Sequence, residues 1–170
     1  MEINNTAKKA YNDIIKVISK SSNSSDLLVG FDVLLQFSLL QVAINDDEFN
    51  NDECEFITSI CQYGDLITFM NNSYLLNYTW KDFLVFPVNQ TKTIMDIVSG
   101  GISVINKGLR EILITAASKD KDLVSNLRDN IYIILNELSL IDGREFSEFD
   151  MKDGCLILDF LLDINISKFN

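Results

Sequence analysis

Residues 26–44 read DLLVGFDVLLQFSLLQVAI, and the prediction of the fold starts from this segment. Its apolar residues recur at helical spacing but occupy nearly every side of the helix: Leu27, Leu28, Phe31, Leu34, Leu35, Leu39 and Val42. A helix that is apolar nearly all round is stable only where other elements cover it. The sequence therefore predicts a central helix in the middle of a bundle.

Further helices are predicted on both sides of this central segment. Before it, residues 6–20 place apolar side chains three and four positions apart, and a serine-rich run at 21–25 separates the two helices. After it, helical spacing predicts one helix from about residue 50 to 70, which an Asn-Asn-Ser run ends. Four more helices are expected at 79–86, at about 91–118, at 120–141 and after Ser147.

The composition agrees with an all-helical domain. No period-two run and no Asn-Gly hairpin occurs, and a single Pro with only 7 Gly argues against a turn-rich β protein. A chain of 170 residues that is 47% hydrophobic can bury a substantial core. We therefore expect one all-α domain spanning residues 1–170, a compact bundle of about six to eight helices.

The charge balance narrows the class of partner. The net charge is −11 and the isoelectric point is near 4.3. Nucleic-acid binding needs clustered Lys and Arg, so nucleic acid is excluded as an expected partner. A divalent cation or a basic protein surface fits this charge better.

The cysteines and the N-terminal residues favour a cytoplasmic protein. Cys54 and Cys61 stand about 10 Å apart along a predicted helix, which exceeds the span of a disulfide and favours free thiols in a reducing compartment. The N-terminal residues lack the apolar core of a signal peptide. No uncharged apolar run approaches the roughly 20 residues that span a bilayer, so membrane insertion is not expected.

Two acidic loops occupy matching places, and each closes one apolar stretch and opens the next. Residues 43–53 read AINDDEFNNDE, and residues 139–150 read SLIDGREFSEFD. Each loop has an acidic pair or an Asp-Gly turn, then an aromatic residue, a helix-capping residue and an acid three positions later. This recurrence suggests an internal duplication, with corners near 37–60 and 131–158 and two pseudo-symmetric halves.

Two interpretations of these acids stay open. Acids at a helix start are favoured by capping and by the helix dipole, each contributing about 0.3–1 kcal/mol, and loops that point outward need no metal. Converging loops would instead bring carboxylates together. Two carboxylates about 5 Å apart repel by roughly 3 kcal/mol at an effective dielectric near 20, and a bound cation is the simplest way to offset that repulsion.

The residue types in the two loops limit which metal ions they can bind. Oxygen-only ligands suit Ca²⁺, Mg²⁺ or Mn²⁺. The chain has no His and its Cys residues are not spaced as ligand pairs, so no structural zinc site is expected. An EF-hand is excluded, because placing Gly143 at the sixth loop position puts Leu138 at the first acidic ligand and Phe149 at the bidentate Glu.

The corner pattern resembles the tellurite-resistance TerB-like family, whose members usually show Ala-x-Ala-Asp-Gly-x-hydrophobic-Ser-x-x-Glu. The first copy matches at Ala43, Asp46, Phe49, Asn50 and Glu53, and the second, with one residue inserted, at Asp142, Gly143, Phe146, Ser147 and Asp150. Three positions depart from the family pattern: Asp47 replaces the glycine, Asn50 the serine, and Asp150 shortens the second acid. The resemblance covers about 60 residues around the corners.

This resemblance implies an all-helical fold with pseudo-twofold halves and an acidic patch that binds metal, in proteins linked to stress response or to membrane-associated complexes. It supplies no enzymatic reaction. The metal-ligand candidates are Asp46, Asp47, Glu53, Asp142 and Asp150. We expect a non-enzymatic module that binds a divalent cation, a protein partner or both. The alternative is an acidic interaction or toxin-neutralising (immunity-type) protein that needs no metal.

Two other features have structural interpretations. The aromatic residues at 74–86 could form an exposed binding patch, or they could pack against the bundle where a connector crosses it. Gly100-Gly101 predicts a kink or a close helix contact.

Cys54 and Cys61 lack the His base that a cysteine nucleophile needs, so catalysis is not expected.

Overall fold

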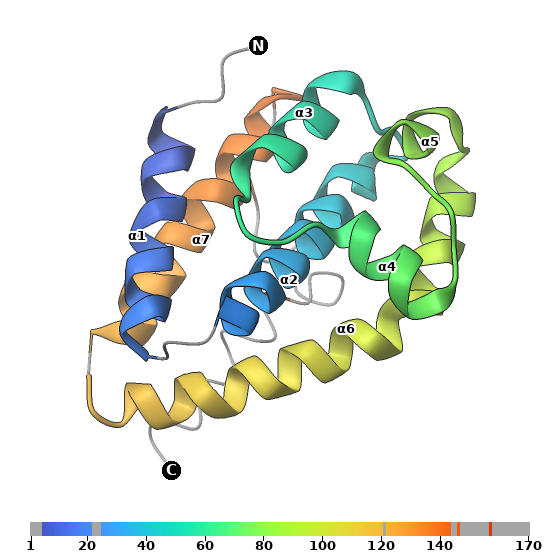
Figure 1. Ribbon diagram of the computed structural model, residues 1–170. Coiled ribbons are helices and arrows are strands. Elements are labelled where there is room, and N and C mark those ends of the chain that lie inside the picture. Colours follow the sequence, from blue (N-terminus) through green and yellow to red (C-terminus); the bar gives the residue numbers. More distant parts are fainter. Residues whose placement is uncertain (1–4, 22–24, 121, 144–145, 147–156, 158–170) are drawn as a thin grey trace.

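A computed structural model describes residues 5–21, 25–120, 122–143, 146 and 157, and every regular element in these residues is a helix (Figure 1). The expectation of an all-α fold is confirmed. The helices are α1 (Asn5–Ser21), α2 (Ser25–Ala43), the 3₁₀ turn η1 (Ile44–Asp46), α3 (Asn51–Ile60), α4 (Leu66–Tyr74), α5 (Trp80–Val85), α6 (Val88–Ala117) and α7 (Leu123–Leu140).

Helix α2 lies at the centre, as its apolar residues predict. It packs against α1, α3, α4, α6 and α7, and buries apolar side chains on all sides, among them Phe31, Leu34, Leu35 and Leu39 (Figure 1). The helical segment Ser25–Asp46 is long and apolar enough to cross a membrane by length and composition alone. Because 78% of its most apolar window is buried inside the protein, its position is that of a core helix.

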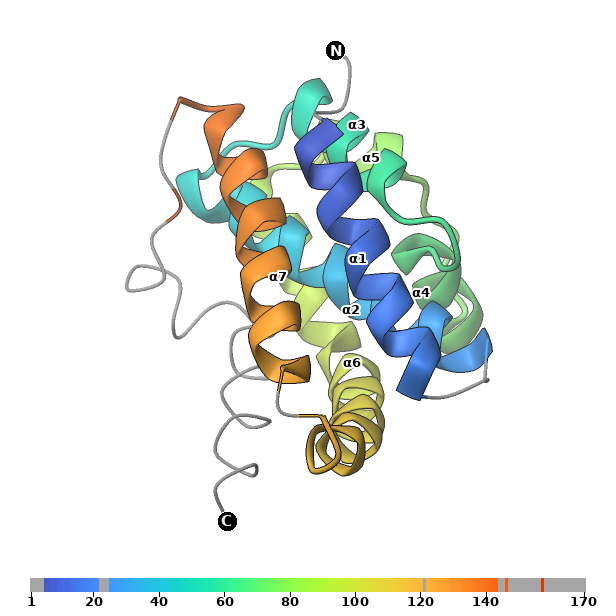
Figure 2. The ribbon, with the colours of Figure 1, turned by 90° about the vertical axis from the view of Figure 1, so that its left-hand side faces the viewer.

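The remaining helices cover α2 from several sides. Helices α1 and α7 lie side by side, although they come from opposite ends of the described chain (Figures 1 and 2). The 30-residue helix α6 crosses one side of the bundle and packs chiefly on α2. Helices α3 and α4 also pack on α2, and the short helix α5 packs on α3 (Figure 1).

The single helix expected from about residue 50 to 70 is wrong, because the chain forms two helices with a break at 61–65. Two polar side chains of α2 accept hydrogen bonds from the backbone at this break. Asp32 accepts from the N–H groups of Tyr63 (2.7 Å) and Gly64 (3.0 Å), and Gln36 accepts from that of Leu66 (2.6 Å). Non-local bonds of this kind override the helical periodicity that the sequence shows.

The aromatic segment packs on the bundle, which agrees with the structural alternative. Phe83 is buried, and the rings of Tyr78, Trp80 and Phe86 contact it at centroid distances of 5.9, 6.3 and 5.8 Å. The indole N–H of Trp80 donates to a carboxylate oxygen of Asp65 (2.8 Å). These contacts hold the connector against α4.

The expected close contact at Gly100-Gly101 is present and involves only the second glycine. The hydroxyl of Tyr74 on α4 accepts from the N–H of Gly101 (2.9 Å) and donates to the carbonyl of Val98 (3.2 Å). A Cβ atom at position 101 would lie 2.8 Å from that hydroxyl, whereas position 100 faces open space. Gly101 therefore lets α4 approach α6 closely.

Candidate cation site at the acidic corners

Three carboxylates from two distant parts of the chain meet where α2, α3 and α7 approach one another. Asp46, Glu53 and Asp142 each offer an oxygen, and these oxygens all lie within 4.8 Å of one another. Asp46 belongs to η1, Glu53 to the first turn of α3, and Asp142 to the turn after α7. The corners therefore converge through these residues instead of pointing apart.

Local turn geometry positions Asp46. The chain tightens into η1 after α2 and ends it at Asp47, which adopts a left-handed conformation (φ 64°) and donates its N–H to the carbonyl of Ile44 (3.0 Å). The N–H of Glu48 then donates to Oδ1 of Asp46 (3.2 Å). This bond restrains the Asp46 carboxylate in an Asx-type turn.

A capping box positions Glu53, as the sequence predicts. Oδ1 of Asn50 accepts from the N–H of Glu53 (2.9 Å), and Oε2 of Glu53 accepts from the N–H of Asn50 (3.0 Å). The corresponding pair in the second corner, Ser147 and Asp150, lies outside the described residues. The capping box turns the Glu53 side chain back toward the corner.

Asn50 also connects the two corners. Its side-chain Nδ2 donates to Oδ1 of Asp142 (3.2 Å), which is 92 residues further along the chain. One asparagine side chain therefore caps α3 with its oxygen and holds Asp142 with its nitrogen. A serine, the usual residue of the TerB-like pattern at this position, could not do both, because its hydroxyl is a single group on a shorter side chain.

The electrostatics of the cluster centre on Glu53, which is only 1% exposed. The pKa of Glu53 is raised to about 8, chiefly by burial and also by a hydrogen bond with Asp142 and the charges of Asp142 and Asp46, while the N–H of Asn50 acts in the opposite direction. At neutral pH the Glu53 carboxyl therefore holds a proton, shared with Asp142. Without a cation, this proton offsets part of the repulsion among the three groups.

The five candidate ligands divide into three groups. Asp46, Glu53 and Asp142 come together. Asp47 does not join them: its side chain is 79% exposed and pairs with Lys92 at 3.1 Å. The left-handed backbone at Asp47 separates its side chain from that of its neighbour. Asp150 lies outside the described residues.

A second buried carboxylate, that of Asp32, was not predicted from the sequence. It is fully buried in α2, and besides the two backbone N–H groups at the α3–α4 break it accepts from the hydroxyl of Tyr11 (2.8 and 2.9 Å). Burial raises the pKa of Asp32, against the lowering effect of its donors. An acid inside an otherwise apolar helix was the signal that could have identified it.

The cluster has the chemistry of a hard-cation site. It offers only carboxylate oxygens. Glu53 is buried, whereas Asp46 and Asp142 are half-buried. Comparisons with protein-family models, with curated proteins and with solved structures find no match for this chain, so the TerB-like resemblance stays a prediction.

Proposed function

We propose that this protein is a non-enzymatic helical module, similar to TerB-like stress-response proteins, that binds a divalent cation through Asp46, Glu53 and Asp142. One observation carries the proposal. A fully buried glutamate lies within 4.8 Å of two further carboxylates, one of which comes from the other corner. On this proposal the cation joins the two corners, and the module acts in the cytoplasm.

Helix capping alone does not account for this arrangement. Capping explains Asn50 and Glu53, because both serve the first turn of α3. It does not explain why Asp142 lies beside them, since Asp142 follows a different helix. Two charged carboxylates at 4.8 Å repel by about 3.5 kcal/mol at an effective dielectric near 20. A proton cancels one charge of the three, whereas a divalent cation attracts all of them.

The spacing is compatible with a single hard cation. Oxygens on opposite sides of Ca²⁺ stand about 4.8 Å apart, because each Ca–O distance is about 2.4 Å. The three carboxylate oxygens all lie within 4.8 Å of one another, so one ion can contact all of them. We therefore propose that the ion is Ca²⁺, Mg²⁺ or Mn²⁺.

Calorimetric titration and thermal melting with each of the three ions test this function. The parent protein should bind one ion and melt at a higher temperature in its presence, since a ligand that binds only the folded state stabilises it. The double variant Glu53→Gln with Asp142→Asn should lose both effects. Asp47→Asn is the matched control, because Asp47 belongs to the same corner but pairs with Lys92, and it should keep them.

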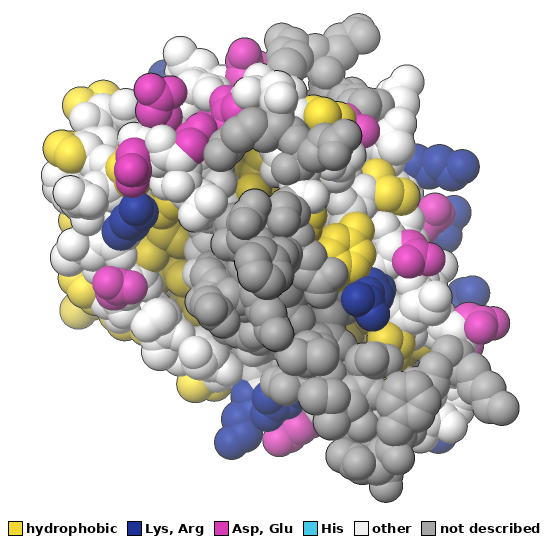
Figure 3. Space-filling view, turned by 180° about the vertical axis from the view of Figure 1, so that it is seen from behind, with side chains coloured by type: hydrophobic (Ala, Val, Ile, Leu, Met, Phe, Trp, Pro, Cys, Tyr) yellow, Lys and Arg dark blue, Asp and Glu magenta, His cyan; other side chains and the backbone are white. Residues whose placement is uncertain are grey.

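The alternative function makes the opposite prediction. An acidic interaction protein that neutralises a basic partner needs no metal, and the net charge of −11 supports it. Seen from behind, acidic side chains gather along one upper edge of the surface while basic ones are scattered (Figure 3). If none of the three ions binds to the parent protein or raises its melting temperature, the cation proposal is wrong and this alternative replaces it.

A further inference from the structure

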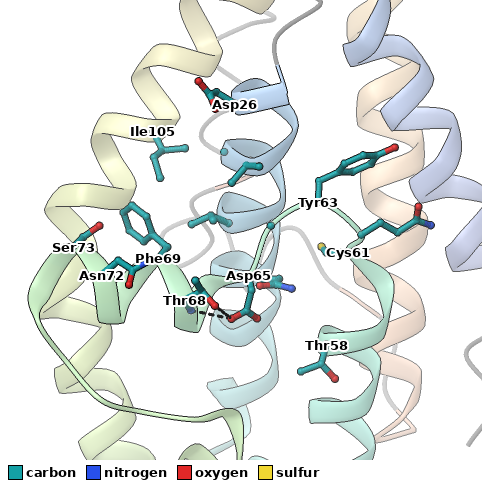
Figure 4. A pocket seen from close by; sticks show the side chains of 16 residues that line it. Asp26, Thr58, Cys61, Tyr63, Asp65, Thr68, Phe69, Asn72, Ser73 and Ile105 are labelled. Atoms are coloured by element: carbon teal, nitrogen blue, oxygen red, sulfur yellow. Dashed lines mark hydrogen bonds between the residues drawn. The ribbon is translucent and has the colours of Figure 1, made fainter.

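A groove of about 760 Å³ lies over residues 26–36 of α2 and shares no residue with the candidate cation site. Figure 4 shows Phe69 of α4 and Ile105 of α6 on one side of α2, and Cys61 and Tyr63 of the α3–α4 connection on the other. Val29 and Val33 of α2 add apolar surface between them. The volume is within the range of sites that bind small ligands or short peptide segments.

The charges of the groove have one sign. Its lining contains the carboxylates of Asp26 and Asp65, and no Lys or Arg among the residues that the structure describes. Asp65 uses its oxygens to accept from the N–H and hydroxyl of Thr68 and from the indole of Trp80. Asp26 is exposed and makes no hydrogen bond or ion pair within the described part of the chain. Its charge is available to a ligand.

Apolar side chains are accessible beside these acids. Val29 is 40% exposed and Tyr63 is 47% exposed, so both present apolar surface to solvent at the groove. Exposed apolar groups next to charged ones are typical of sites that bind protein segments.

The groove is rigid where the α3–α4 connection crosses α2. Asp32 holds the N–H groups of Tyr63 and Gly64. A Cβ atom at Gly64 would lie 2.6 Å from the carbonyl oxygen of Val29, so only glycine allows the connection to cross this closely. A ligand therefore meets a pre-organised surface, which lowers the entropic cost of binding.

We propose that this groove binds a short segment of a basic partner protein, in which an apolar side chain flanked by Lys or Arg packs against Val29 and Phe69 while a cationic group faces Asp26. Charge complementarity identifies the occupant: the lining residues that the structure describes include Asp26 and Asp65 but no Lys or Arg, and the chain carries a net charge of −11. The inference goes beyond the cation proposal and uses none of its ligands, so either can fail alone.

A fluorescein-labelled peptide, Lys-Leu-Arg-Lys-Leu-Lys, is a suitable probe in fluorescence polarisation at low ionic strength. It should bind the parent protein, whereas versions with every base replaced by Glu or with both Leu replaced by Ser should not. Asp26→Lys should weaken binding about tenfold. Asp96→Lys makes the same charge change on the exposed face of α6, outside the groove, and should weaken it less than about twofold.

Backbone amide NMR of the unmodified protein provides a second measurement that does not depend on a variant folding. The peptide should shift the amide signals of Gly30, Gly64 and Thr68, which line the groove. The proposal is overturned if no peptide binds, if the serine version binds as well as the leucine version, or if Asp26→Lys and Asp96→Lys weaken binding equally. Shifts confined to the acidic corners would overturn it as well.

Discussion

The side-chain nitrogen of Asn50 donates a hydrogen bond to Oδ1 of Asp142 at 3.2 Å, and this bond joins two acidic corners that lie 92 residues apart in the chain. The same side chain caps α3 through its oxygen. Asn50 therefore both caps α3 and holds the two corners together.

Replacing Asn50 separates these two roles. Asn50→Ala removes both the cap and the bond to Asp142, and should lower the free energy of unfolding by about 1–2 kcal/mol. Asn50→Ser retains a capping hydroxyl but loses the bond to Asp142, and should cost less. Urea unfolding followed by circular dichroism measures both. Equal losses in the two variants would show that the cap contributes nothing and that the whole loss comes from the bond to Asp142.

The buried Glu53 makes the stability of the cation-free protein depend on pH. The pKa of Glu53 is about 8 in the folded state and near 4.5 in the unfolded state, so the folded state binds more protons between these values. Stability should therefore fall as pH rises from about 4.5 to 8, by at most about 1.4 kcal/mol per pH unit, and then level off. Urea unfolding in EDTA across this range should show the decrease. Glu53→Gln should reduce it, and an unchanged slope in that variant would contradict the assignment to Glu53.

Cation binding should release a proton. Near pH 7 the folded protein holds a proton on the Glu53–Asp142 pair, and a divalent cation competes for the same oxygens. Titration calorimetry in buffers of different ionisation enthalpy should give a release of close to one proton at pH 7 and much less at pH 9. A release that does not change with pH would place the bound ion elsewhere.

Asp32 should be more important for stability than any exposed acid. Asp32→Ala leaves two backbone N–H groups and the Tyr11 hydroxyl without their acceptor, and should lower the free energy of unfolding by about 3–5 kcal/mol. Asp32→Asn retains one carbonyl oxygen for the two N–H groups, and its amide can donate to Tyr11, so its cost should be smaller. If the two variants lose equal stability, the bonds to the α3–α4 break are not what makes Asp32 important.

The two adjacent glycines of α6 should respond in opposite directions to alanine. Gly101→Ala places a methyl group 2.8 Å from the Tyr74 hydroxyl and should destabilise the protein by about 1–3 kcal/mol. Gly100→Ala faces open space within a helix and should stabilise it by about 0.5–1 kcal/mol. Thermal melting of the pair checks both signs. A stabilising Gly101→Ala would mean that Tyr74 moves without cost.

The sequence predicts the elements that depend on local chemistry. The all-round apolar residues of α2 identify the central helix, and Asn50 with Glu53 identifies a capping box, because both patterns arise from neighbouring residues. The repeated corners suggested five candidate ligands, and the structure brings three of them, Asp46, Glu53 and Asp142, together.

What the sequence missed depends on contacts between distant residues. The break between α3 and α4 follows from bonds that Asp32 and Gln36 make about 30 residues away. Asp47 differs from Asp46 through a left-handed turn at a non-glycine residue, which spacing alone does not reveal. Asn50 was recognised as a cap, but its contact with Asp142 requires the two corners to meet in space.

The pairing of α1 with α7 has a consequence for protein synthesis. Helix α1 buries Ile14 and Ile18, and its chief partner, α7, begins only at Leu123. Until that partner emerges, α1 can pack only on α2, α3 and α6, which cover less of its apolar side. The contact between α1 and α7 therefore forms only after the residues that separate the two helices have been translated, and a ribosome stalled before residue 123 would display part of the apolar side of α1 as a target for chaperones.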